Sequence, residues 1–136
     1  MVTPKNLRRV FYVELLVNLA SILAFMFGGA AILEQFGVAV VTPPLVEAFQ
    51  WFATLLIVIT YILARALFAQ NDRALRYVLE GYLIGDLVYL VVLFRFVGAI
   101  GGVWTFGSVF GLAFTVFIAT MRVLYLWQTR GRRNGK

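Results

Sequence analysis

Cysteine and histidine are both absent from the sequence. Without cysteine the chain has no disulfide, no thiolate nucleophile and no sulfur ligand for a metal. Without histidine it lacks the commonest metal ligand and the commonest general base at neutral pH. We therefore expect neither a metal nor a cofactor, and no catalytic residue stands out.

Charged residues are scarce. They make up 13% of the 136 residues, and hydrophobic residues make up 62%. A soluble globular domain has about a quarter of its residues charged. Because so few charges cannot cover a surface that faces water, the composition predicts an integral membrane protein whose exterior faces the lipid bilayer.

Four segments are long enough to cross a bilayer, for which a helix needs about 20 mostly apolar residues. They span about residues 10–33, 45–69, 75–96 and 103–127. The breaks between them contain Thr42-Pro43-Pro44, Gln70-Asn71-Asp72-Arg73 and the glycine-rich residues 98–102. We expect one all-α domain over residues 1–136, a polytopic left-handed bundle of four transmembrane helices.

The basic residues are distributed unequally between the two sides of this bundle. Of the twelve, Arg95 alone falls on one side. The other side holds Lys5, Arg8, Arg9, Arg65, Arg73, Arg76, Arg122, Arg130, Arg132, Arg133 and Lys136. Basic residues concentrate on the cytoplasmic side of membrane proteins. We therefore expect a multi-pass protein of the inner (cell) membrane with both termini cytoplasmic.

A signal peptide and nucleic-acid binding account for the basic residues less well. A cleaved signal peptide has a shorter apolar stretch than the first segment, which also contains Glu14 and Asn18. Nucleic-acid binding does not fit charges that gather at helix ends. For the basic residues near the C-terminus, topology and contact with lipid headgroups are sufficient.

Polar residues recur inside the four segments at intervals of three, four and seven. The sets are Glu14, Asn18 and Ser21; Glu47, Gln50, Thr54, Tyr61 and Arg65; Tyr82, Asp86 and Tyr89; and Ser108, Gly111, Thr115 and Arg122. These intervals place each set on one helix face. Because polar groups that face lipid are costly, we expect all four faces to turn inward.

Depth separates these residues into layers. Glu14, Arg65 and Arg122 lie near the cytoplasmic ends, where an intramembrane ion pair would keep Glu14 charged and hold the bundle together. On the outer side, Glu47 and Arg95 are placed to form a solvated interfacial pair.

Asp86 is the strongest candidate for function. It lies near the expected midplane with no cation at its own depth, so we expect a neutral acid that bonds to Asn18, Ser21 or Thr115. An unpaired acid inside a membrane segment indicates a functional site. Tyr82 and Tyr89 share its helix face, and we expect a ligand pocket beside it, lined by aromatic residues.

The stretch from Pro43 to Phe94 resembles the DoxX-like group of bacterial membrane proteins and their distant EXPERA-type relatives. It combines a proline-led helix, PPLVEAFQWFATLLIVITYILA, a short turn, QNDRALR, and a helix that begins GYLIGDLVYL. The resemblance implies a four-helix membrane fold. EXPERA-type members bind or isomerise sterol-like molecules, but this sequence lacks the histidines of the isomerases.

The leading hypothesis is a non-enzymatic bundle that binds a lipophilic molecule or serves as an accessory subunit of a membrane complex. The 13 phenylalanines, six tyrosines and three tryptophans suit either role. The alternatives are a small proton-coupled transporter and a metal-free enzyme, both using Asp86 and Glu14. The expected partners are the bilayer, a lipophilic ligand, and further copies or other subunits.

Overall fold

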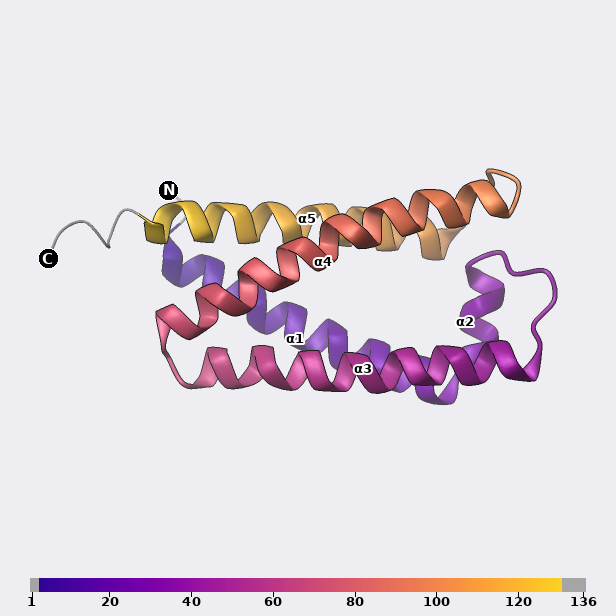
Figure 1. Cartoon of the computed structure of the whole chain (residues 1–136), viewed down its shortest axis with the longest axis horizontal. Coiled ribbons are helices and arrows are strands. Elements are labelled where there is room, and N and C mark those ends of the chain that lie inside the picture. Colours follow the sequence, from indigo (N-terminus) through magenta and orange to yellow (C-terminus); the bar gives the residue numbers. More distant parts are fainter. Residues whose placement is uncertain (1–2, 131–136) are drawn as a thin grey trace, which may run out of the picture.

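The computed structural model describes residues 3–130, which are helical apart from turns and loops (Figure 1). The helices are α1 (Pro4–Phe27), α2 (Gly29–Gln35), α3 (Pro43–Phe68), α4 (Asp72–Ala99) and α5 (Phe106–Arg130). Four of them are long and apolar enough to cross a membrane, and the exception is α2. The expected all-α class with four apolar helices is therefore confirmed.

Local sequence signals explain where the long helices begin. The side chain of Thr3 accepts a hydrogen bond from the backbone N–H of Asn6 at 3.3 Å, with Pro4 in the first turn of α1. Pro43 likewise stands in the first turn of α3, although the residue before it, Thr42, makes no side-chain capping bond. Asn71 caps α4, because its Oδ1 accepts from the backbone N–H groups of residues 73 and 74. Such caps satisfy amide groups that have no partner within the helix.

The predicted bounds need correction at the first segment. Residues 10–33 are not one helix, because α1 ends at Phe27 and the chain turns at Gly28 into the short helix α2. The backbone N–H of Gly28 still bonds to the carbonyl of Ala24, at 2.7 Å, before the turn. The residues on both sides of the turn are apolar, so hydropathy alone did not reveal it. Helix α1 also begins earlier, at Pro4, and α5 begins later, at Phe106.

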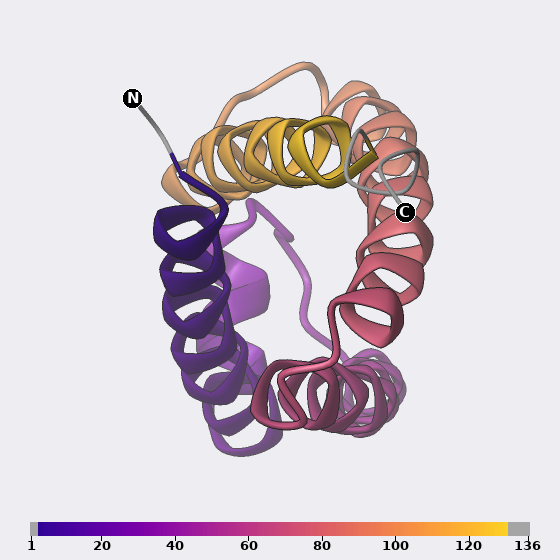
Figure 2. The same cartoon turned by 90° about the vertical axis from the view of Figure 1, so that its left-hand side faces the viewer.

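The four long helices form an antiparallel ring in the order α1, α3, α4, α5, each contacting the two beside it (Figure 2). Helix α1 begins and α5 ends at the same end of the bundle (Figure 1). We call this the terminal end, and the opposite end, which holds α2 and the long loops, the loop end. Helix α2 lies across the loop end, where it contacts α1, α3 and α5.

Two of the helices change neighbours along the bundle. Helix α4 starts beside α3 at the terminal end and finishes beside α5 at the loop end, while α1 starts near α5 and finishes near α3 (Figures 1 and 2). The α1–α3 pair and the α4–α5 pair are therefore most separated at the loop end, where α2 lies between α1, α3 and α5.

The apolar core is concentrated at the terminal end. One cluster of buried side chains comes from the first part of α1, the end of α3, the start of α4 and the end of α5. Its members are Leu7, Phe11, Leu63, Ala66, Leu67, Leu75, Leu79 and Tyr125. Large apolar side chains such as Leu16 and Ile84 are instead exposed on the outside of the bundle. This is the distribution expected of a bundle surrounded by lipid.

Candidate functional site

A cluster of three charged side chains lies inside the bundle, which we call the charged cluster: Glu14, Asp86 and Arg122. From α5, Nη2 of Arg122 donates to Oε1 of Glu14 on α1. Nη1 of the same guanidinium donates to Oδ2 of Asp86 on α4. One arginine thus joins two carboxylates from two other helices.

The three members differ in exposure. The side chains of Glu14 and Arg122 are 3% and 2% exposed, whereas that of Asp86 is 16% exposed. A charge inside a membrane bundle is tolerated when it is paired and hydrogen-bonded. Asp86 is paired as well, but it is the member that a molecule arriving from outside the cluster would meet first.

Tyr82 of α4 extends the charged cluster to the remaining long helix. The Cζ atom of Arg122 lies 4.8 Å from the centre of the Tyr82 ring, which is a cation–π arrangement. The hydroxyl group of Tyr82 donates to the backbone carbonyl of Ile59 on α3. All four long helices therefore meet at this level of the bundle.

Several buried polar atoms at this level have no hydrogen-bond partner among the described residues. They are Oε2 of Glu14, Nε of Arg122 and Oγ1 of Thr60 on α3. Buried polar groups are nearly always hydrogen-bonded, because leaving one unpaired costs free energy. The charged cluster and its surroundings thus retain the capacity to bind a further polar group.

The expectation that Asp86 has no cation near it is wrong. Helix side chains point back toward the N-terminus of their own helix. Arg122 on α5 therefore reaches toward the loop end, while Asp86 on the antiparallel α4 reaches toward the terminal end. The two groups converge although their backbones differ in depth. The direct partner of Asp86 is accordingly Arg122 rather than Asn18, Ser21 or Thr115.

Arg65 does not join the ion pair that Glu14 and Arg122 form. Its side chain is exposed, and it makes no ion pair among residues 3–130. The buried face of α3 contains Thr60, Leu63 and Leu67. Arg65 follows Leu63 by two positions, which places it on the opposite side of the helix.

Glu47 and Arg95 are likewise not paired with each other in the described part of the chain, and both are exposed. Glu47 lies near the start of α3 and Arg95 near the end of α4, so both belong to the loop end. There α4 has moved away from α3 and lies beside α5 (Figure 1). The divergence of the two helices accounts for the missing pair.

The polar face predicted for α3 also does not turn inward. Glu47, Thr54, Tyr61 and Arg65 are exposed, and Gln50 is half-buried. The free-energy cost of exposing these polar side chains to lipid is partly offset by hydrogen bonds. The hydroxyl of Thr54 donates to the backbone carbonyl of residue 50 in the same helix, at 3.1 Å. The Gln50 amide donates to the carbonyl of Met26 on α1, also at 3.1 Å.

The remaining candidate residues are half-buried beyond the charged cluster, toward the loop end. They are Asn18 and Ser21 on α1, Tyr89 on α4 and Thr115 on α5. Tyr89 lies close to α5 because Gly111 leaves room for it, and a Cβ atom added to Gly111 would be 2.5 Å from the Tyr89 hydroxyl. These polar side chains retain partial exposure, unlike the apolar core at the terminal end.

A shallow groove lies further along α4, lined by Val92, Arg95, Phe96 and Ala99. Arg95 lies nine positions after Asp86, which places the two on opposite faces of the helix. This groove is therefore not the pocket that the sequence predicts beside Asp86, and that pocket stays a prediction.

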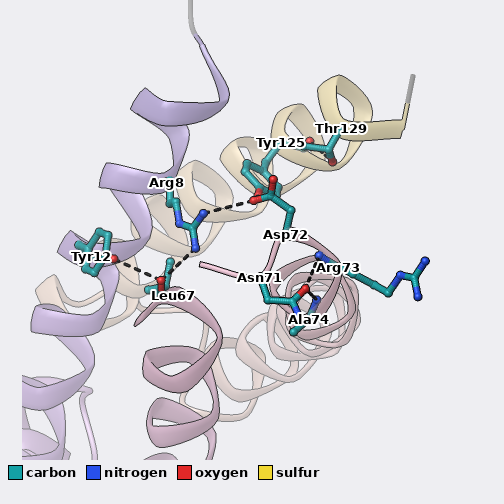
Figure 3. Close-up of polar contacts among 9 residues, drawn as sticks. All are labelled: Arg8, Tyr12, Leu67, Asn71, Asp72, Arg73, Ala74, Tyr125 and Thr129. Atoms are coloured by element: carbon teal, nitrogen blue, oxygen red, sulfur yellow. Dashed lines mark hydrogen bonds and ion pairs between the residues drawn. The ribbon is translucent and has the colours of Figure 1, made fainter. Parts of the chain in front are cut away.

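A second polar cluster, which the sequence did not predict, ties the four long helices together at the terminal end (Figure 3). Arg8 of α1 donates to Oδ1 of Asp72 at 3.2 Å and to the carbonyl of Leu67, near the end of α3, at 2.9 Å. Tyr125 of α5 donates to the same oxygen of Asp72 at 3.2 Å. The acidic residue that opens α4 was the available signal, since Asp72 follows the helix cap Asn71.

Neither a metal centre nor a known relative helps to define the site. Among residues 3–130, no group of three or more acidic, histidine or cysteine side chains is placed to hold a metal ion. No family model, no curated protein and no solved structure matches this chain. The candidate site is therefore defined by its own geometry: the charged cluster, Tyr82 and the half-buried polar residues beside them.

Proposed function

We propose that this protein is a non-enzymatic membrane protein that binds a lipophilic small molecule, with the polar group of that molecule at the charged cluster. One observation carries the proposal. The carboxylate of Asp86 is partly exposed while its partner Arg122 is fully enclosed. A purely structural ion pair gains nothing from such exposure, whereas a binding site needs one accessible polar group to orient its ligand.

The distribution of packing supports the same proposal. The apolar core fills the terminal end, below the charged cluster. On the other side of the cluster, the polar residues Asn18, Tyr89 and Thr115 are half-buried. A ligand between these residues would complete the packing that the core provides at the terminal end. The surrounding bilayer would supply such a molecule.

We further propose that the bundle is left-handed and that its terminal end faces the cytoplasm of a cell with an inner membrane. Eleven of the twelve basic residues belong to segments expected on that side. The start of α1, the turn between α3 and α4 and the end of α5 share one end of the bundle, as this topology requires (Figure 1). Membership of the DoxX-like group stays a prediction.

Native mass spectrometry of gently extracted protein tests the proposed binding. We expect the protein to retain a lipophilic molecule and to lose it in the Asp86→Asn variant. The Arg65→Gln variant is the matched control, because Arg65 is exposed and outside the charged cluster. Equal retention of the molecule by Asp86→Asn and Arg65→Gln would contradict the proposal, as would the absence of any bound lipophile from the unaltered protein.

A role as an accessory subunit or homo-oligomer is the second candidate, and one observation favours it. Tyr61 lies inside a membrane-spanning helix and is 63% exposed. Its polar ring would be covered if a partner helix packed on this face of α3. The same mass spectra distinguish the two candidates, because a subunit would retain protein partners rather than a small molecule.

The charged cluster also keeps a proton-coupled transporter among the alternatives, since two carboxylates share a single guanidinium. Transport requires that one carboxylate releases its partner and takes up a proton. Uptake of protons by vesicles that contain the protein would favour this alternative, and the Asp86→Asn variant would abolish it.

A further inference from the structure

The formal charges of the charged cluster do not cancel. Glu14 and Asp86 each contribute one negative charge when ionised, and Arg122 contributes one positive charge. No other cation forms an ion pair with either carboxylate among the described residues. An unbalanced charge in a low-dielectric interior is costly, so the cluster favours the addition of one positive charge.

The unpaired atoms indicate where that charge would lie. Oε2 of Glu14 is buried and accepts no hydrogen bond from the described residues, although the residue is only 2% exposed. Asp86 binds Arg122 through Oδ2 alone. Each carboxylate therefore keeps one oxygen free to accept a hydrogen bond. A positively charged group that donates to these two oxygens would satisfy them and balance the charge of the cluster.

The rest of the site fits a lipophilic donor. Tyr89 follows Asp86 by three positions, so it lies on the same face of α4, and its half-buried ring adds an amphipathic surface to that face. Toward the loop end, the polar residues beyond the cluster are separated by apolar ones, and all lie within helices that are apolar enough to span a membrane. A molecule that reaches this site must be soluble in lipid.

We propose that the charged cluster selects lipophilic cations, in which a protonated amine donates to Glu14 and Asp86 and an apolar chain extends toward the loop end. This inference rests on the proposed function and adds the chemical class of the ligand. It predicts discrimination by charge among molecules that share the same chain.

Three amphiphiles with one saturated chain test this selectivity: decylammonium, decanol and decanoate. The protein is reconstituted in phosphatidylcholine nanodiscs, and binding is measured by equilibrium dialysis, with empty nanodiscs giving the non-specific partition. We expect saturable binding of decylammonium, tighter than that of decanol or decanoate by roughly tenfold or more. The cation would bind through paired charge, and the anion would be repelled.

The variants assign this binding to the charged cluster. Asp86→Asn leaves the Glu14–Arg122 pair, and Glu14→Gln leaves the Asp86–Arg122 pair, so each variant keeps one ion pair to hold the fold. Both should weaken decylammonium binding toward that of decanol. Glu80→Gln is the matched control on α4, because Glu80 forms a surface pair with Arg76 at 3.2 Å. It should bind decylammonium as tightly as the unaltered protein does.

Two results would overturn the inference in different ways. If decanol binds saturably and as tightly as decylammonium, a proton balances the charged cluster, and the protein binds lipophiles without selecting cations. Unchanged decylammonium binding in both cluster variants would show that the cation binds elsewhere and that the charged cluster does not select it. If none of the three molecules binds above the empty nanodiscs, the proposed function fails together with the selectivity.

Discussion

Arg122 links the polar groups of several helices in the interior of the bundle. Its guanidinium joins carboxylates from α1 and α4 and lies over the ring of Tyr82, which itself bonds to α3. The planar arrangement of several N–H donors explains why arginine suits this position, because lysine could not hold two carboxylates in one fixed geometry. The consequence is an unequal dependence of stability on the three charged residues.

We predict that Arg122→Gln is the most destabilising single change in the charged cluster. It leaves the buried carboxylate of Glu14 and the partly exposed carboxylate of Asp86 without a countercharge, and loss of one partner from a buried ion pair typically costs about 3–5 kcal/mol. Glu14→Gln and Asp86→Asn each leave a one-to-one ion pair and should cost less. The free energy of unfolding in mixed detergent micelles, followed by circular dichroism, gives this ranking.

The triple variant Glu14→Gln, Asp86→Asn, Arg122→Gln removes all three charges and should recover part of the stability lost in Arg122→Gln. Arg65→Gln is the surface control, for which a change within about 0.5 kcal/mol is expected. The account of the charged cluster is wrong if Arg122→Gln proves as stable as this control.

At the scale of elements, the distance between α4 and α5 depends on a small residue. Gly111 on α5 faces Tyr89 on α4, and a Cβ atom there would lie 2.5 Å from the tyrosine hydroxyl. We predict that Gly111→Ala incurs an overpacking cost of about 1–3 kcal/mol, reduced by movement of the Tyr89 hydroxyl and by the roughly 1 kcal/mol that alanine gains over glycine in a helix. Tyr89→Phe removes the hydroxyl, so the double variant should recover most of this loss. Unfolding of the single and double variants measures the coupling.

Gly85 provides the control for this experiment. It lies within α4, but a Cβ atom added to it would meet nothing within 4 Å. Gly85→Ala should therefore raise stability slightly, by up to about 1 kcal/mol, because alanine is more favourable than glycine inside a helix. An equal loss in Gly85→Ala and Gly111→Ala would show that glycine matters here for another reason than its contact with Tyr89.

The elements also show what a single sequence can predict. The four long helices follow from runs of apolar residues, and their starts follow from Pro43 in the first turn of α3 and from the side-chain cap Asn71 of α4. The turn at Gly28 has apolar residues on both sides and leaves no signal in hydropathy. Helical spacing shows that Glu47, Thr54 and Tyr61 share a face, but it does not show which way the face turns.

Part of the candidate site was also predictable from helical spacing and depth. Spacing and depth brought Glu14 and Arg122 to one level, where the structure pairs them. The Asp86–Arg122 contact depends on the direction of side chains on antiparallel helices, which a comparison of backbone depth leaves out. The bonds of Arg8 to Asp72 and Leu67 depend on how three helix ends meet, so they needed the assembled bundle.

At the scale of the whole molecule, the two ends of the bundle differ. The terminal end has a packed apolar core and bonds that join all four long helices (Figure 3). The loop end is covered by α2 and the loop that follows it, with the ring of Phe36 packed edge-on to Phe96 of α4 at 6.4 Å. An apolar core below the charged cluster, with half-buried polar residues above it, suits a ligand that binds above the charged cluster.

The orientation of this asymmetry in the membrane is the last prediction, and the absence of native cysteine makes it simple to test. Single cysteines replace exposed residues outside the helix interiors. Ala39 and Val103 probe the loop end, and Ala69 probes the terminal end. These positions are preferable to Gly37 and Gly101, whose φ angles of 87° and 85° would strain a side chain.

In intact cells, an impermeant maleimide should label the cysteines at 39 and 103, while the cysteine at 69 should react only after the membrane is opened. A reporter active only in the cytoplasm, fused after Lys136, should also be functional. Labelling of residue 69 in intact cells would reverse the proposed orientation, and with it the conclusion that basic residues hold the terminal end on the cytoplasmic side.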